Sequence, residues 1–153
     1  MKIGFGCDHR GLGARGPIMR LLARMGHECV DFGTDSDNPV DYPDIAYLVT
    51  RALVQGQVDR GILVCATGMG MCLAANKVRG ARATFCHDEL SARTARHHNH
   101  ANVLCLSADQ TSEVLRRKII EVWLQTETGG GRHARRIRKI AAIEEGRDPR
   151  TVK

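Results

Sequence analysis

Apolar residues along this chain alternate between short continuous runs and longer segments with helical spacing. The short runs are typical of buried strands and lie at residues 2–7, 27–32, 58–65, 82–86 and 102–106. The run at residues 58–65 is the most apolar, so we expect it at the centre of a parallel sheet, where both faces are covered. Five such runs predict five strands of one sheet.

The segments between these runs space their apolar residues as helices do. Helices are expected in the segment that ends at Gly26, at residues 43–54, in the small-residue segment through Val78, and at residues 89–98 and 111–125. Three glycines at 129–131 then break the chain. A last helix is predicted at about residues 133–145, with an apolar stripe on Ile137, Ile140 and Ile143.

Five alternations of strand and helix predict a three-layer, Rossmann-like fold. The expected architecture is an open parallel five-stranded sheet with helices on both faces and an extra C-terminal helix. We expect one domain over residues 1–146 and a basic tail at 147–153. In such sheets a ligand lies outside the carboxyl ends of the strands, so residues that directly follow strands are the first candidates for a site.

Composition and charge exclude several classes of protein. With 153 residues, 42% of them hydrophobic and 26% charged, the chain has the composition of one globular domain. No apolar run approaches the roughly 20 residues of a membrane span, and Asp8 comes too early for a signal peptide, so we expect a cytoplasmic protein. Residues 132–153 hold eight Arg or Lys and three acidic residues, but aromatics are only 4%, so we expect no nucleic-acid binding.

Six cysteines are dispersed without a CxxC pair, which predicts reduced thiols and argues against a cysteine zinc site. Cys65 ends the central strand and precedes Thr67-Gly68-Met69-Gly70, where backbone amides can converge at the start of a helix. The positive end of a helix favours thiolate, so Cys65 could act as a base. The alternative is a buried strand cysteine beside a tight turn.

Histidines and one aspartate offer acid and base groups. Asp8 and His9 directly follow the first strand and could form a general acid/base pair, unless Asp8 only caps the next helix. His97, His98 and His100 stand near the end of a predicted helix, but neighbouring helical positions point in different directions. We therefore expect one catalytic histidine there and no metal site.

Basic residues on the last helix suggest an anion site. Arg132 and Arg136 are four positions apart and share one face of the helix, while Arg135 and Lys139 share another. Two guanidinium groups on one face match a phosphate. Solvation or surface salt bridges are the alternative interpretation.

Together these residues resemble the ribose-5-phosphate isomerase B family, which also contains allose- and galactose-phosphate isomerases. The resemblance extends over nearly the whole chain. The motifs that carry it are Gly6-Cys7-Asp8-His9, Asp41-Tyr42-Pro43, the stretch from Gly61 through Cys65, Thr67, Gly68 and Gly70 to Lys77, His98-Asn99 with Asn102-Val103-Leu104, and Gly130-Gly131-Arg132-His133 with Arg136.

The resemblance implies an enzyme that interconverts ribose 5-phosphate and ribulose 5-phosphate through an enediolate, without metal or organic cofactor. It also implies a homodimer whose active sites each contain residues of both subunits; whether dimers pair into tetramers stays open. The alternatives are an isomerase of allose 6-phosphate, galactose 6-phosphate or a four-carbon sugar phosphate, and then a non-catalytic phosphate- or nucleotide-binding module.

The resemblance also implies roles for individual residues. Cys65 corresponds to the base that moves a proton between C1 and C2, and His98 to the group that assists ring opening. Asp8 would aid proton transfer at ring oxygens. The remaining residues would bind substrate: Tyr42 at the sugar, Thr67, Gly68, Gly70 and Asn99 at the enediolate, and His9, Arg132 and Arg136 at the phosphate.

Three positions depart from the family pattern. Ala66 stands where many members have Gly, and His100 where many have Asp. Asp109 lies where members often carry an arginine that contributes to phosphate binding. Asp109 would repel phosphate if it faced the site, so either Arg135 or another basic group replaces that arginine, or the substrate differs in length or shape.

Overall fold

The computed structural model describes all residues from Met1 to Lys153, and its strands form one parallel sheet. The central position of the most apolar strand is confirmed, because β3 has two strands on either side. The strands are β1 (Lys2–Cys7), β2 (Glu28–Asp31), β3 (Arg60–Cys65), β4 (Ala83–Phe85) and β5 (Val103–Ser107), in the spatial order β2-β1-β3-β5-β4.

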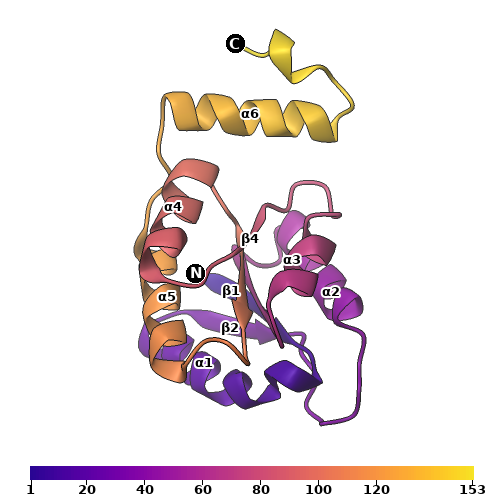
Figure 1. The fold of residues 1–153 in the computed structure, drawn as a ribbon, viewed down its shortest axis with the longest axis vertical. Coiled ribbons are helices and arrows are strands. Elements are labelled where there is room, and N and C mark those ends of the chain that lie inside the picture. Colours follow the sequence, from indigo (N-terminus) through magenta and orange to yellow (C-terminus); the bar gives the residue numbers. More distant parts are fainter.

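Helices cover both faces of the sheet, which confirms the predicted three layers (Figure 1). One face packs against α1 (Leu12–Arg24), α4 (Glu89–Asn99) and α5 (Glu113–Gln125), around a core that includes Trp123. The other face packs against α2 (Tyr42–Val54) and α3 (Met69–Ala75), around Val49, Leu63 and Met71. No helix is long and apolar enough to cross a membrane.

Helix α3 ends earlier than the sequence pattern predicted. The small-residue segment continues through Val78, but the helix stops at Ala75 and Asn76 caps it. The Asn76 side chain accepts a hydrogen bond from the Ala83 amide and donates one to the Ala83 carbonyl, both at 2.9 Å. This pairing with the start of β4 replaces further helical turns.

The extra helix, α6 (Arg132–Glu144), stands apart from the sheet at the end of the molecule where α4 ends (Figure 1). Gly131, with φ of 57°, begins it, and Ala142 is its one buried residue. The basic tail folds back on this helix, because Lys139 Nζ donates to the Pro149 carbonyl at 2.7 Å. The tail contains a short 3₁₀ turn, η2 (Pro149–Thr151).

Candidate active site

Cys65 is the last residue of β3 and is only 4% exposed. Its sulfur accepts a hydrogen bond from the Gly68 amide at 3.2 Å. Gly68 has φ of 77°, and a Cβ there would lie 2.7 Å from the Phe85 ring. Only glycine fits this turn, which folds the chain back so that an N–H meets the sulfur.

The first turn of α3 presents hydrogen-bond donors next to the loop that follows Cys65, residues 66–68, which we call the cysteine loop. The Met69 amide donates to Thr67 Oγ1 at 3.3 Å, whereas the amides of Gly70 and Met71 donate to no protein acceptor. A Cβ on Gly70 would lie 2.7 Å from the Tyr42 ring, so the absence of a side chain lets Tyr42 cover this turn. Free N–H groups at a helix start suit an oxygen that gains negative charge.

Asp8 and His9 lie beside this loop because β1 is the neighbour of β3. The Asp8 amide donates to the Val64 carbonyl at 3.3 Å. Asp8 is 5% exposed, and its carboxylate accepts the Gly11 amide at 2.9 Å, so it caps the 3₁₀ turn η1 (His9–Gly11) as well as lying next to Cys65. His9 Nδ1 accepts the Val40 amide at 3.3 Å, which leaves the proton of a neutral ring on Nε2.

Two other thiols at strand ends are poor candidates for a base. Burial raises the pKa of Cys7 to about 12 and that of Cys86 to about 11. A thiol with such a pKa carries almost no thiolate at neutral pH. What distinguishes Cys65 is the hydrogen bond that its sulfur accepts from the Gly68 amide.

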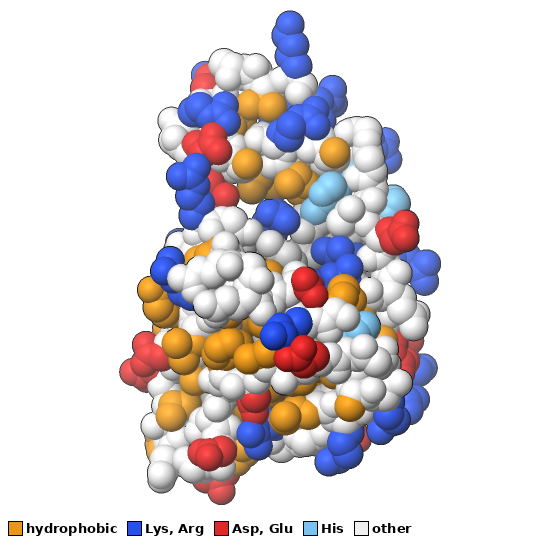
Figure 2. Space-filling model, turned by 180° about the vertical axis from the view of Figure 1, so that it is seen from behind, with side chains coloured by type: hydrophobic (Ala, Val, Ile, Leu, Met, Phe, Trp, Pro, Cys, Tyr) orange, Lys and Arg blue, Asp and Glu red, His pale blue; other side chains and the backbone are white.

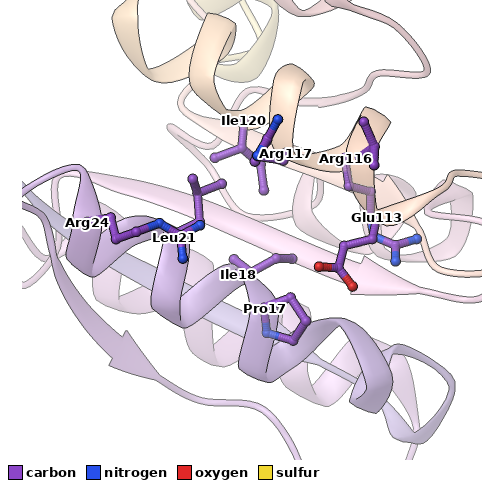
Figure 3. A pocket seen from close by; sticks show the side chains of 9 residues that line it. Pro17, Ile18, Leu21, Arg24, Glu113, Arg116, Arg117 and Ile120 are labelled. Atoms are coloured by element: carbon purple, nitrogen blue, oxygen red, sulfur yellow. The ribbon is translucent and has the colours of Figure 1, made fainter.

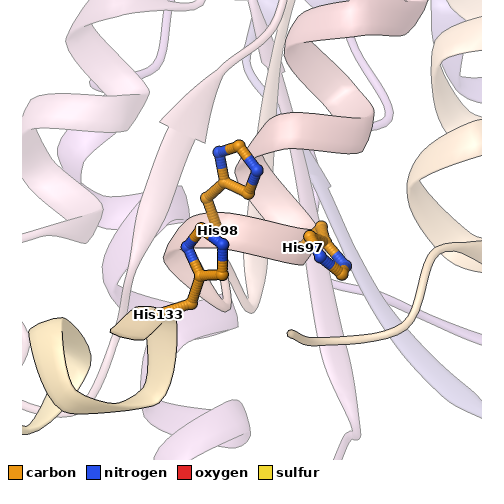
Figure 4. Close-up of side chains that lie close together, drawn as sticks. All are labelled: His97, His98 and His133. Carbon is orange, nitrogen blue, oxygen red and sulfur yellow. The ribbon is translucent and has the colours of Figure 1, made fainter. Parts of the chain in front are cut away.

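The residues described so far lie where the strands end, which we call the carboxyl edge of the sheet. A second group of predicted residues lies on the opposite side, where the strands begin, which we call the amino edge. Helix α4 returns from the carboxyl end of β4 to the start of β5, so His98 and Asn99 at its end lie near the amino ends of the strands. The His98 ring stacks on His133 of α6, with ring centroids 4.2 Å apart and an interplanar angle of 5° (Figure 4). Arg132 and Arg136 are exposed on the same helix.

A single chain does not bring the two groups together. Along β3, Cys65 at the carboxyl end lies four residue steps from Gly61 near the amino end, which corresponds to about 13 Å at the usual rise per residue. Proton transfer needs contact at hydrogen-bond distance. The carboxyl edge holds Asp8, His9, Tyr42, Cys65, Thr67, Gly68 and Gly70, and the amino edge holds His98, Asn99, Arg132 and Arg136.

The histidine cluster at the amino edge differs from the one considered from sequence. His100 ends α4 with φ of 49° and places its Nε2 2.7 Å from the Gly129 carbonyl. His133 takes its place, and the ligand atoms of His97, His98 and His133 all lie within 4.8 Å of one another. Sequence analysis named His133 in a motif but did not place it in this cluster, since only the turn through the three glycines returns α6 to α4.

The charge around this cluster favours an anion over a divalent cation. Desolvation, the neighbouring His98 and the guanidinium of Arg132 lower the pKa of His133. Arg136 acts in the same direction. A group of histidines could ligate a metal ion, but two adjacent guanidinium groups repel one and attract phosphate.

The acidic position Asp109 is paired with a cation that sequence analysis did not consider. Arg10 Nη2 donates to Asp109 Oδ2 at 2.8 Å. Arg135, the replacement named from sequence, lies instead on α6 at the amino edge. The two members of the pair are 99 positions apart, so no local pattern connects them.

Two grooves lie outside the strand ends. A groove of about 80 Å³ between α1 and α5 is lined by Pro17, Ile18 and Leu21 among other residues, and it holds no Cys, Ser or His (Figure 3). This is smaller than the roughly 300 Å³ of ordinary ligand pockets. A groove of about 340 Å³ runs between α6 and the main body and includes Asn99 and Ile140; the surface is hollowed there (Figure 2).

Comparison with known proteins gives a consistent result. Residues 3–140 match the family model described as ribose/galactose isomerase. The chain is 42% identical to ribose-5-phosphate isomerase B of Escherichia coli over 147 residues, which cover 96% of this chain and 99% of the relative. It is 40% identical to D-erythrulose-4-phosphate isomerase of Pectobacterium atrosepticum over 146 residues, which cover 94% and 95%.

A solved structure agrees with this result. Ribose-5-phosphate isomerase B of Clostridium thermocellum superposes with a TM-score of 0.94 at 44% identity, over 95% of this chain and 99% of that one.

Proposed function

Because the chain belongs to the ribose/galactose isomerase family, we propose that it is an aldose–ketose isomerase that interconverts ribose 5-phosphate and ribulose 5-phosphate. The observation that carries the chemistry is Cys65, held at the end of β3 with an N–H on its sulfur and two free amides nearby. This arrangement fits a base beside a site for negative charge.

In the proposed reaction the Cys65 thiolate removes the proton from C2 of the open-chain aldose. The electron pair shifts to the carbonyl oxygen on C1 and forms an enediolate, which the Gly70 and Met71 amides and Thr67 stabilise. The thiol then returns the proton to C1, while the hydroxyl proton moves from O2 to O1. One lost donor at such an oxygen typically costs about 10²–10³ in rate. These steps use no metal or organic cofactor.

Ring opening needs an acid and a base outside this loop. Asp8 is close to Cys65 and can accept a proton from a ring hydroxyl. His98, the proposed partner in this step, lies at the other edge of its own chain. We therefore propose a homodimer in which the partner's His98 and the partner's Asn99 complete the site around Cys65.

Surface features support this assembly. Leu73 and Met69 on α3 are 68% and 53% exposed, next to the carboxyl edge. Ile140 and Ile143 of α6 are 41% and 61% exposed and line the groove beside the amino edge. Contact between α3 of one copy and α6 of the other would cover these apolar side chains and place the two halves of the site together.

The phosphate would lie between His9 and the partner's Arg132 and the partner's Arg136. Binding energy from this remote group holds C1 and C2 in place for proton transfer.

A four-carbon sugar phosphate is the second candidate substrate. The relative named D-erythrulose-4-phosphate isomerase is nearly as similar as the ribose-5-phosphate isomerase B.

Turnover by purified protein tests the proposal. Ribose 5-phosphate, allose 6-phosphate and erythrulose 4-phosphate should be compared at equal concentration, with and without a chelator. We expect the highest kcat/KM with ribose 5-phosphate and no effect of the chelator. A preference for erythrulose 4-phosphate would support the second candidate, and no turnover of any of the three would contradict an isomerase.

A further inference from the structure

One positive charge stands out at the carboxyl edge. The five segments that follow the strands, residues 8–11, 32–41, 66–68, 86–88 and 108–112, contain a single Arg or Lys, which is Arg10. The same segments contain six aspartates. Two further guanidinium groups reach this edge from helices, but Arg15 is paired with Asp31 and Arg116 donates to the carbonyls of Ser107 and Ala108. Arg10 is therefore the exposed cation that a phosphate dianion would meet there.

Arg10 is held in a fixed place relative to the cysteine loop. It lies in η1, which packs tightly on β3, since a Cβ on Gly11 would lie 2.6 Å from the Val64 carbonyl oxygen. Its partner Asp109 is attached to the other side of the loop, because the Asp109 amide donates to the Ala66 carbonyl at 3.1 Å. The ion pair therefore spans from η1 to the loop that follows Cys65.

The guanidinium still has donors to offer. Nη2 is used by Asp109, whereas Nε and Nη1 make no hydrogen bond, and the side chain is 58% exposed. The neighbouring His9 presents its Nε2, because Nδ1 accepts the Val40 amide. Guanidinium N–H groups in a planar fork match phosphate oxygens.

Building on the proposed isomerase function, we propose that Arg10 is the residue of the carboxyl edge that binds the substrate's phosphate and so selects phosphorylated sugars. Asp109 accepts a hydrogen bond from Nη2 of Arg10, while the free Nε and Nη1 of Arg10, together with His9, contact the phosphate. The cation that this chain lacks at position 109 is thereby supplied from position 10.

An ordinary surface ion pair is the competing interpretation. Such a pair contributes little to stability and nothing to substrate binding. The chain offers a matched control, because Arg117 on α5 has a similar exposure of 52% and forms an exposed pair with Glu121 at 3.8 Å, outside the segments that follow strands.

Steady-state kinetics with ribose 5-phosphate and inhibition by inorganic phosphate distinguish a phosphate-binding Arg10 from an ordinary surface ion pair. Arg10→Ala should raise KM and the inhibition constant for phosphate about 10- to 100-fold, as expected for a lost charge-assisted hydrogen bond, with kcat within about twofold. Arg10→Lys keeps the charge without the fork and should fall between wild type and Arg10→Ala. Arg117→Ala should match wild type. Unchanged KM and inhibition constant in Arg10→Ala would overturn the proposal.

Calorimetric titration with inorganic phosphate tests the same contact without turnover. We expect weaker binding by Arg10→Ala and Arg10→Lys than by wild type and Arg117→Ala. Equal affinity in all four proteins, or no binding by wild type, would overturn the role of Arg10. A wild type that binds phosphate through Arg10 but does not isomerise ribose 5-phosphate would contradict the proposed function alone.

Discussion

The two edges of the sheet position their functional groups by different means. At the carboxyl edge the backbone does this: Cys65 ends a buried strand, and Gly68 adopts a conformation that only glycine tolerates. At the amino edge, exposed side chains do it: Arg132 and Arg136 lie on a helix with one buried residue, joined to the body through three glycines. The proposed base Cys65 is thus fixed by the core, whereas the two arginines that would attract an anion from the partner are carried on a surface helix.

This difference fits the tolerances of the two tasks. Proton transfer depends on distances near 3 Å, and a small displacement of the base lowers the rate strongly. Attraction of a phosphate dianion by guanidinium groups varies more slowly with distance. We expect changes at Cys65 and Gly68 to reduce turnover or stability, and changes at Arg132 and Arg136 to weaken phosphate binding instead.

The largest effect is expected from removing the proposed base. Cys65→Ala should lower kcat about 10³-fold or more, because Asp8 and His9, the other bases at this edge, are engaged in ring opening and phosphate binding. Cys29→Ala, on β2, is a matched control and should keep kcat. Measurement of kcat with ribose 5-phosphate decides this, and full activity of Cys65→Ala would remove it from the mechanism.

A mixed dimer tests whether the two edges come from different chains. Cys65→Ala and His98→Asn should be co-expressed with different tags, and the hybrid purified through both. One of its two sites then carries both defects and the other carries neither, so we expect about half of wild-type activity, with both parent homodimers nearly inactive. If each chain held a complete site, the hybrid would be as inactive as its parents.

Glycine substitutions test the rigidity of the two edges. Gly68→Ala introduces a side chain at φ of 77° and within 3 Å of Phe85 and of the Leu106 backbone. We expect a loss of about 1–3 kcal/mol in the free energy of unfolding, seen as a lower Tm. Gly130→Ala meets no atom within 4 Å and should leave Tm nearly unchanged. Equal Tm shifts would show that the two edges do not differ in this way.

The last prediction concerns the chemical reactivity of Cys72 in α3, and of all the changes it is expected to affect activity least. A hydrogen bond from Cys105 lowers the pKa of Cys72 to about 7, whereas burial raises the pKa of Cys29 to about 11. Thiolate forms at Cys72 above about pH 7 and is lost below it. Iodoacetamide should therefore label Cys72 increasingly between pH 6 and 8 and leave Cys29 unlabelled, as measured by peptide mass spectrometry. Equal labelling of both at pH 7 would contradict this.

Sequence patterns predicted the carboxyl edge well, because its residues directly follow strands that apolar runs make recognisable. Asp8 directly follows β1 and Cys65 ends the neighbouring strand β3, which pairs in parallel with β1. Element boundaries were less predictable where a side chain decides them. Asn76 ends α3 through hydrogen bonds to Ala83, and the helical pattern of the sequence does not predict that contact.

At the amino edge, the sequence indicated which residues are candidates but not how they lie relative to one another. The spacing of Arg132 and Arg136 indicates a shared helix face, yet it says nothing about where that helix lies. The stack of His98 on His133 depends on the path through residues 129–131. The ion pair of Arg10 and Asp109 joins segments 99 positions apart, and such contacts follow from the fold alone.

The return of the C-terminal tail onto α6 has a practical consequence for handling the protein. Arg138 donates to the Lys153 carbonyl at 3.1 Å, so the last residue lies on the helix that also carries Arg132 and Arg136. An affinity tag fused after Lys153 would emerge beside this basic surface, and an acidic tag would compete with phosphate there. Met1 instead lies at the start of β1, next to His27. Tags for kinetic work are therefore best placed at the N-terminus and removed by cleavage before any KM is measured.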